Sequence, residues 1–224
     1  YHKLLLDTHI DFIKAGAEVI VTTTFTTRKT RLKDNGVEDK FEYLNKKAGE
    51  ISQQAKSHFP NVLIAGGLPP QFLTYEADPR SEEEIKENFY DQAKLLNPYI
   101  DFFYFDVLSS VKEFKIAIDC IKEFDKPYLI GAHISEGTKL PSGEKISEII
   151  DKISHQKLLG IILSCISPDT YDLNLNEIKN LGVPFGFKLN AFVKTNPKPN
   201  YTGAYKKSKT GNPNEFLGQR KDLT

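Results

Sequence analysis

Cys165 ends an apolar stretch, residues 158–164, and Pro168 follows it closely. The stretch predicts a strand buried on both faces, as strands of parallel sheets usually are. A thiol at the end of such a strand can face a pocket above the sheet, and a thiolate is among the best protein ligands for zinc. Since a lone buried cysteine is more often a small core residue, the case for chemistry at Cys165 depends on its neighbours.

Polar or glycine-rich groups also follow the other predicted strands. In chain order, the groups are Thr22-Thr23-Thr24-Phe25, Gly66-Gly67-Leu68-Pro69-Pro70, Asp106, His133-Ile134-Ser135, Ser164-Cys165 and Asn190-Ala191. Parallel strands bring their carboxyl ends to one edge of a sheet, where ligands bind. Asp106 either caps the following helix or holds a cationic ligand. His133 either touches a substrate or is a hydrogen-bonded structural residue.

The elements that carry these groups alternate between strand and helix. Strands are predicted over residues 18–24, 61–65, 101–105, 127–132, 158–165 and 184–189. An amphipathic pattern over residues 41–55 predicts one of the intervening helices, and Ser81 with Glu84 has the spacing of a capping box. Such alternation predicts an α/β fold with a parallel sheet, either open and doubly wound or closed as a (β/α)₈ barrel. No GxGxxG follows the first strand, which disfavours dinucleotide binding.

Composition excludes several classes of function. The 224 residues contain 30 Lys and Arg and 30 Asp and Glu, and this zero net charge gives no general affinity for nucleic acid or an anionic membrane. No apolar stretch is long enough to span a membrane, and no signal peptide is evident. The 2 cysteines do not make a disulfide framework, so a cytoplasmic location is expected. Cys120, in a predicted helix, is expected in the core.

The ordered groups resemble the homocysteine S-methyltransferase family, zinc-dependent thiol methyltransferases built on a (β/α)₈ TIM barrel. The resemblance rests on the segments 15–18, 22–25, 66–70 with Tyr75, 101–106, 162–165 and 189–191. It covers the chain as a single domain, residues 1–224, in which 194–224 are expected to form a long loop. It implies that the first and last strands of the barrel would lie before Tyr1 and beyond Thr224.

The resemblance implies methyl transfer from a small methyl donor to a small thiol such as homocysteine, with no nucleic-acid or membrane partner. The oligomeric state is left open, a homo-oligomer included. Cys165 would be one zinc ligand, and two further cysteines beyond Thr224 would supply the others. Asp106 would hold the substrate's amino group. The implied substrate-binding residues are Thr24, Phe25, Gly66, Gly67, Asp106, Ser164 and Asn190.

Several positions depart from the family's pattern. Asp106 replaces the usual Glu, Ser164 replaces the usual Asn, and Thr23 and Val107 also differ. These changes indicate a different thiol, a different donor or lost activity. One alternative is therefore a non-catalytic or divergent barrel of the same family that binds an amino-acid-like ligand. Another is an unrelated aldolase or lyase, which would need a lysine or a cluster of carboxylates at the strand ends. Lys188 is the lysine there, and it is expected to point away from the pocket.

Overall fold

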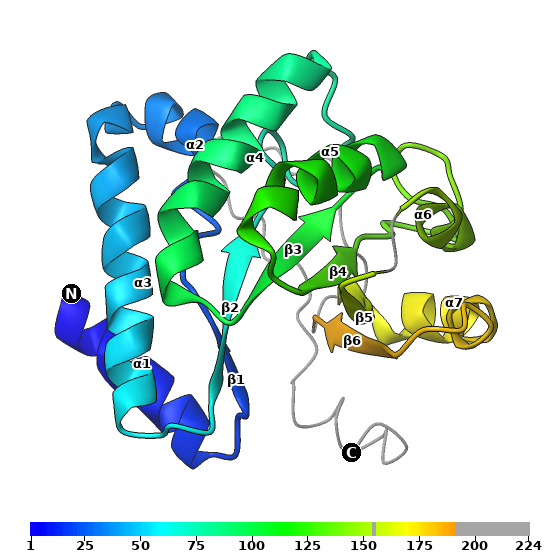
Figure 1. Ribbon diagram of the computed structural model, residues 1–224. Helices are drawn as coiled ribbons and strands as arrows, with labels where there is room; N and C mark the ends of the chain where they lie inside the picture. The colour runs from blue at the N-terminus through cyan, green and yellow to red at the C-terminus, as the bar shows by residue number, and fades with distance from the viewer. Residues whose placement is uncertain (154–155, 191–224) are drawn as a thin grey trace, which may run out of the picture.

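The computed structural model describes residues 1–153 and 156–190 of the chain. Its strands form one six-stranded parallel sheet in the order β1-β2-β3-β4-β5-β6. The strands are β1 (Val19–Val21), β2 (Leu63–Leu68), β3 (Phe102–Leu108), β4 (Tyr128–Ala132), β5 (Leu158–Ile166) and β6 (Phe185–Leu189). Each strand pairs with the next one in sequence, whereas a doubly wound sheet reverses direction partway. The order therefore rules out the doubly wound alternative and matches part of a barrel (Figure 1).

The helices lie along the outer side of the curved sheet (Figure 1). They are α1 (His2–Lys14), α2 (Lys29–Asp34), α3 (Phe41–Ser57), α4 (Glu82–Leu96), α5 (Val111–Ile121), α6 (Ile146–Lys152) and α7 (Pro168–Lys179). Helix α4 begins with the predicted capping box, in which Ser81 and Glu84 bond each other's backbone N–H groups. This pairing satisfies donors that the first turn of a helix leaves free.

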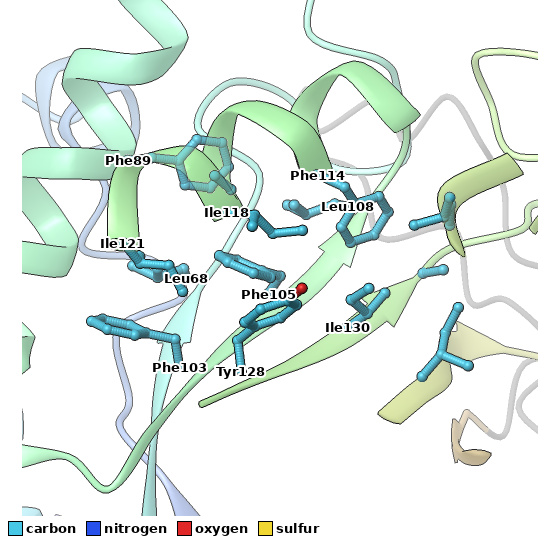
Figure 2. Packing of buried hydrophobic residues seen from close by; sticks show 14 of the residues in the cluster. Leu68, Phe89, Phe103, Phe105, Leu108, Phe114, Ile118, Ile121, Tyr128 and Ile130 are labelled. Atoms are coloured by element: carbon cyan, nitrogen blue, oxygen red, sulfur yellow. The ribbon is translucent and has the colours of Figure 1, made fainter. Parts of the chain in front are cut away.

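The main core fills the layer between the sheet and the helices (Figure 2). Phe103 and Phe105 of β3 point into it and are fully buried, as are Phe89 of α4 and Phe114 of α5. Truncating a buried phenylalanine to alanine costs about 3–5 kcal/mol, so these rings fix the helices against the strands. The predicted core position of Cys120 in α5 is confirmed, because its exposed fraction is 4%.

A smaller apolar cluster lies on the opposite, inner face of the sheet. It contains Ala65, Phe102 and Tyr104, with Leu129 and Ile162 packed against it. Because side chains alternate along a strand, the same face continues through Asp106 of β3 and Ser164 of β5. The inner face is thus apolar along the middle of the strands and polar toward their carboxyl ends.

Two further expectations concern the chain as a whole. In residues 1–153 and 156–190, no helix has the length and apolarity that crossing a membrane requires. The loop predicted over residues 194–224 lies outside the described residues.

Candidate thiol site at the strand ends

Two strands carry an irregularity just where the site residues stand. In β5, Ser164 pairs with Lys188 and Ile166 pairs with Leu189, so Cys165 is an extra residue between two pairs that are adjacent on β6. In β3, the register shifts between Phe105 and Leu108. Such bulges re-aim side chains and are frequent next to active sites.

Backbone strain is concentrated at these bulges. Among the described residues, φ is positive at four non-glycine positions: Tyr75 (72°), Val107 (68°), Asp125 (54°) and Cys165 (59°). Val107 and Cys165 occupy the two bulges, and Tyr75 contacts Cys165. A non-glycine residue in this region costs of order 1–3 kcal/mol and persists where the surroundings hold it, typically at functional sites.

Two polar side chains contact the sulfur of Cys165, which is a half-buried residue. The hydroxyl of Tyr75 lies 2.9 Å from Sγ, and Nδ2 of Asn190 donates to Sγ over 3.6 Å. Tyr75 comes from the loop after β2 and Asn190 follows β6, so three separate segments meet at the sulfur. The Asn190 amide donates to the sulfur and the Tyr75 hydroxyl is able to, an arrangement that suits a sulfur carrying negative charge, as a metal-bound thiolate does.

His133, directly after β4, contacts both the backbone of β5 next to Cys165 and the ring of Tyr75. It is fully buried, its Nδ1 donates to the carbonyl of Ser164 at 3.1 Å, and its Nε2 accepts from Ser135 at 3.0 Å. Burial lowers the pKa of His133 to about 4, so the ring is neutral at pH 7. Its ring packs on Tyr75 with centroids 4.4 Å apart. Since both nitrogens are engaged, the structural interpretation of His133 fits.

A second polar group lies on the inner face beside Cys165. Lys188 Nζ contacts both carboxylate oxygens of Asp106, at 2.7 and 2.8 Å. It also lies 5.6 Å from the ring centroid of Tyr104, whose hydroxyl is 2.8 Å from Ser164 Oγ. Burial and the nearby Asp106 carboxylate raise the pKa of Tyr104 well above its usual value, so the phenol stays neutral. Lys188 thus faces the site, and the expectation that it points away is wrong.

The tip after β1 is tied to β2 by side-chain hydrogen bonds. Thr24 Oγ1 donates to the carbonyl of Gly67 at 2.7 Å, and Gly67 N–H donates to Thr22 Oγ1 at 2.9 Å. Thr24 is fully buried, so its hydroxyl is committed to the backbone. Phe25 follows, half-buried, with the buried Arg28 guanidinium 5.4 Å from its ring centroid. These hydrogen bonds, which we call the Thr24 clamp, hold the residues after β1 against β2 at the edge of the site.

The two glycines of β2 face opposite sides of the sheet. A Cβ on Gly66 would meet Ile100 at 2.5 Å, in the layer under the helices. A Cβ on Gly67 would meet Val21 at 3.1 Å, on the inner face. The geometry gives Gly66 a packing role, whereas Gly67 faces the inner side beside Thr22 and Thr24, and its contact with a ligand stays a prediction.

The implied zinc can be tested against the side chains present. In the described part of the chain, no group of three or more His, Cys, Asp or Glu side chains could hold a metal ion. Cys165 has the donor chemistry of one zinc ligand, and its neighbours Tyr75 and Asn190 are suited to orienting it. The described residues therefore offer one candidate ligand, Cys165, whereas a zinc site needs at least three protein ligands.

The structure brings together most of the residues predicted for the site. Cys165, Ser164, Asp106 and Asn190 share one end of the sheet, with the Thr24 clamp two strands from Asp106. Sequence reasoning missed the role of Lys188 and the contact of Tyr104 with Ser164. The signal was available, because Lys188 lies two residues before Asn190, and side chains two residues apart in an extended chain point to the same side.

Comparison with known proteins agrees with this geometry. A sequence profile of the homocysteine S-methyltransferase family matches residues 1–219. Betaine–homocysteine S-methyltransferase 1 of Rattus norvegicus is 29% identical over 126 residues, which cover 53% of this chain and 30% of that protein. S-methylmethionine–homocysteine S-methyltransferase BHMT2 of Pongo abelii is 27% identical over 129 residues, which cover 57% of this chain and 33% of that protein. The chain thus spans a minor part of the length of these curated relatives.

A solved structure shares the fold. The metallated form of the homocysteine methyltransferase MmuM from Escherichia coli superposes with a TM-score of 0.70 at 15% identity, covering 87% of this chain and 81% of that one. At this identity, the likeness concerns the fold. Since the family profile covers residues 1–219, the chain belongs to the homocysteine S-methyltransferase family.

Proposed function

We propose that the protein is a zinc-dependent S-methyltransferase that moves a methyl group from an onium donor to a small thiol of the homocysteine type. The observation that carries the proposal is Cys165, whose sulfur is turned into the site by a strained bulge and met by Tyr75 and Asn190. The proposal places this site at the carboxyl end of a (β/α)₈ barrel, in a cytoplasmic protein.

The described residues would position rather than transform the reactants. Cys165 would be one zinc ligand, completed by ligands outside the described residues, and Tyr75 and Asn190 would fix its orientation. When bound, zinc would lower the pKa of a coordinated substrate thiol and so supply a thiolate nucleophile at neutral pH. The hydrogen bond from Thr24 to Gly67 would fix the loop after β1 at the edge of the site. The hydrogen bond between Tyr104 and Ser164 would fix the side chains on the inner face of the sheet.

The transfer itself is balanced without a further reactant. An electron pair on the thiolate sulfur forms the new S–C bond, while the donor's bond between methyl carbon and positively charged nitrogen or sulfur breaks. That electron pair stays with the donor and neutralises it. The thiol proton leaves to solvent. Holding sulfur and methyl carbon in line is a matter of positioning, which can supply a large part of the rate.

A direct assay tests this function. The full-length protein is incubated with homocysteine or a related thiol together with one onium donor, which is betaine, S-methylmethionine or S-adenosylmethionine, and methylated thiol is detected by mass spectrometry. We expect product with at least one pair, retained by Cys120→Ala and lost by Cys165→Ala. The same thiols bound without any turnover would favour the non-catalytic alternative. Equal turnover by the two variants would contradict a role for Cys165.

A further inference from the structure

The ion pair between Asp106 and Lys188 occupies the place assigned to the substrate's amino group. Both carboxylate oxygens of Asp106 lie within 2.8 Å of Lys188 Nζ. The side chain of Asp106 is only 9% exposed, whereas that of Lys188 is 48% exposed. The carboxylate is therefore covered on its open side by an ammonium that the protein itself provides.

The ion pair between Asp106 and Lys188 makes binding of a positively charged ligand group at Asp106 less favourable. A substrate ammonium at Asp106 would have to displace Lys188, which is tethered to the same sheet and acts at a high effective concentration. The displaced lysine would remain beside the incoming ammonium, and like charges brought together in this way are strongly unfavourable. An α-amino group is thus disfavoured at this position.

Lys188 in turn offers a donor for an anion. An ammonium has three N–H donors, and the two oxygens of Asp106 account for two of them. Lys188 also lies over the ring of Tyr104, whose hydroxyl contacts Ser164, the residue before Cys165. The half-exposed ammonium of Lys188 and the sulfur of Cys165 consequently lie at the same end of the sheet.

From these contacts we infer that the methyl acceptor is a small thiol that carries a carboxylate and lacks an α-amino group, with Lys188 as the residue that selects it. This inference rests on the proposed function, because it names the acceptor class for the same site. Lys188 would bind the carboxylate while Asp106 keeps the lysine in place and excludes amino-acid thiols.

Three ligands that differ by one group each test the inference. Homocysteine carries both charged groups, γ-mercaptobutyrate lacks only the amino group, and mercaptopropylamine lacks only the carboxylate. Their binding to the full-length protein is measured by calorimetry, and methylated products are measured separately. We expect γ-mercaptobutyrate to bind at least about tenfold more tightly than homocysteine, and mercaptopropylamine to bind most weakly.

Variants assign the preference to the ion pair. Lys188→Gln should reduce or reverse the preference for γ-mercaptobutyrate, because it uncovers Asp106 for an amino group. Asp106→Asn should keep the preference, because Lys188 remains and loses its counter-charge. Lys46→Gln, which breaks an exposed pair with Glu42 on α3, is the matched control and should leave the preference unchanged.

The outcomes separate this inference from the proposed function. Tighter binding of homocysteine to the unaltered protein, no binding of any of the three, or an unchanged preference in folded Lys188→Gln would overturn the inference. The expected binding order without methylation of any thiol would overturn the proposed methyl transfer and leave the selection by Lys188 standing.

Discussion

Cys165 is held in a conformation that cysteine adopts only under constraint. Its φ of 59° places it in the left-handed region, and its neighbour in space, Tyr75, has φ of 72°. Each hydrogen bond or ring contact that holds this pair offsets part of the strain, and the buried ring of His133 packs against Tyr75. The hydroxyl of Tyr75 has a specific partner in the sulfur of Cys165.

Removing that hydroxyl should weaken metal binding without disturbing the fold. Tyr75→Phe keeps the ring against His133 but loses the contact at 2.9 Å with Sγ. Since partners that orient a metal ligand typically contribute 10–100-fold to affinity, zinc affinity should fall by about tenfold. Competition with a chelator of known affinity measures the change.

The matched control for this prediction is Tyr43→Phe. Tyr43 is exposed, and its hydroxyl reaches His2 at 3.5 Å, far from the strand ends. Zinc affinity should be unaffected there. If Tyr75→Phe binds zinc as tightly as Tyr43→Phe does, the hydroxyl does not orient Cys165.

Residue types in the sequence predicted the candidates but not all of their contacts. The buried strand that ends near Cys165 was predicted from its apolar residues and is confirmed as β5. The contact between Asp106 and Lys188 joins residues 82 positions apart, and no local pattern specifies such a contact. The direction predicted for Lys188 was wrong, because its ammonium reaches Asp106 of β3 on the inner face of the sheet.

At the scale of elements, the site depends on how closely β3, β4 and β5 approach one another. A Cβ on Gly131 of β4 would lie 2.7 Å from the carbonyl oxygen of Phe105, 2.7 Å from Ser164 Oγ and 2.8 Å from the ring of Tyr104. Only glycine leaves room for the Tyr104–Ser164 hydrogen bond between the flanking strands. The bulges in β3 and β5 follow directly after this narrow region.

Gly131→Ala should therefore be destabilising. Because one of the clashing atoms belongs to the backbone of β3, the strand cannot move aside easily, and the free energy of unfolding should fall by roughly 1–3 kcal/mol. Gly186→Ala in β6 is the control, since among the described residues its Cβ would meet a single side-chain atom, Ile162 Cγ2, at 3.2 Å. Urea denaturation of both variants measures the difference. An equal loss at the two positions would mean that the narrow region is not the constraint.

Runs of apolar and β-branched residues were sufficient to predict the strands but not their irregularities. All six predicted strands are present in the parallel sheet. The bulges were not predicted, because Val107 and Cys165 are not the glycine or asparagine that usually indicates positive φ. Tertiary packing imposes the left-handed conformation at both positions.

At the scale of the whole molecule, one buried carboxyl group outside the site makes stability depend on pH. Glu113 of α5 is fully buried, and its Oε2 accepts from Ser110 at 2.7 Å. Burial raises the pKa of Glu113 from 4.5 to about 7, with a smaller contribution from the nearby Asp78 carboxylate. The folded protein therefore keeps this proton at pH values at which the unfolded chain has released it.

The sign of the effect follows from the raised pKa. Below about pH 4.5, Glu113 is protonated in both states, and its contribution is fully present. As pH rises from 4.5 toward about 7, Glu113 ionises in the unfolded chain but stays protonated in the folded protein, and this ionisation stabilises the unfolded chain. The free energy of unfolding therefore falls, by about 3 kcal/mol in order of magnitude. Glu113→Gln should remove this slope and be relatively more stable than the unaltered protein at pH 8.

Unfolding of the two proteins between pH 4.5 and 8 checks the prediction. His133 has a lowered pKa and contributes in the opposite direction, since its stabilisation is lost as pH falls below about 6.5. That contribution is common to both proteins and cancels in the difference. Parallel stability curves for the two proteins would show that Glu113 does not hold its proton in the fold.

The order of the strands is the feature of the whole fold that the strand and helix pattern alone left open, and only the resemblance to a family implied a barrel. Doubly wound sheets and barrels share the same alternation of strand and helix, so periodicity could not choose between them. The pairing of each strand with the next one along the chain decides the question in favour of a barrel-like arc. This arc is what places Cys165, Asp106 and Lys188 at one end of a common inner face.

The zinc content of the full-length protein decides whether Cys165 is a zinc ligand. Elemental analysis after purification should find stoichiometric zinc in the unaltered protein and in Cys120→Ala, whose altered thiol lies in the outer core. Cys165→Ala should hold none. Absence of zinc from the unaltered protein, or equal zinc in the two variants, would contradict the account.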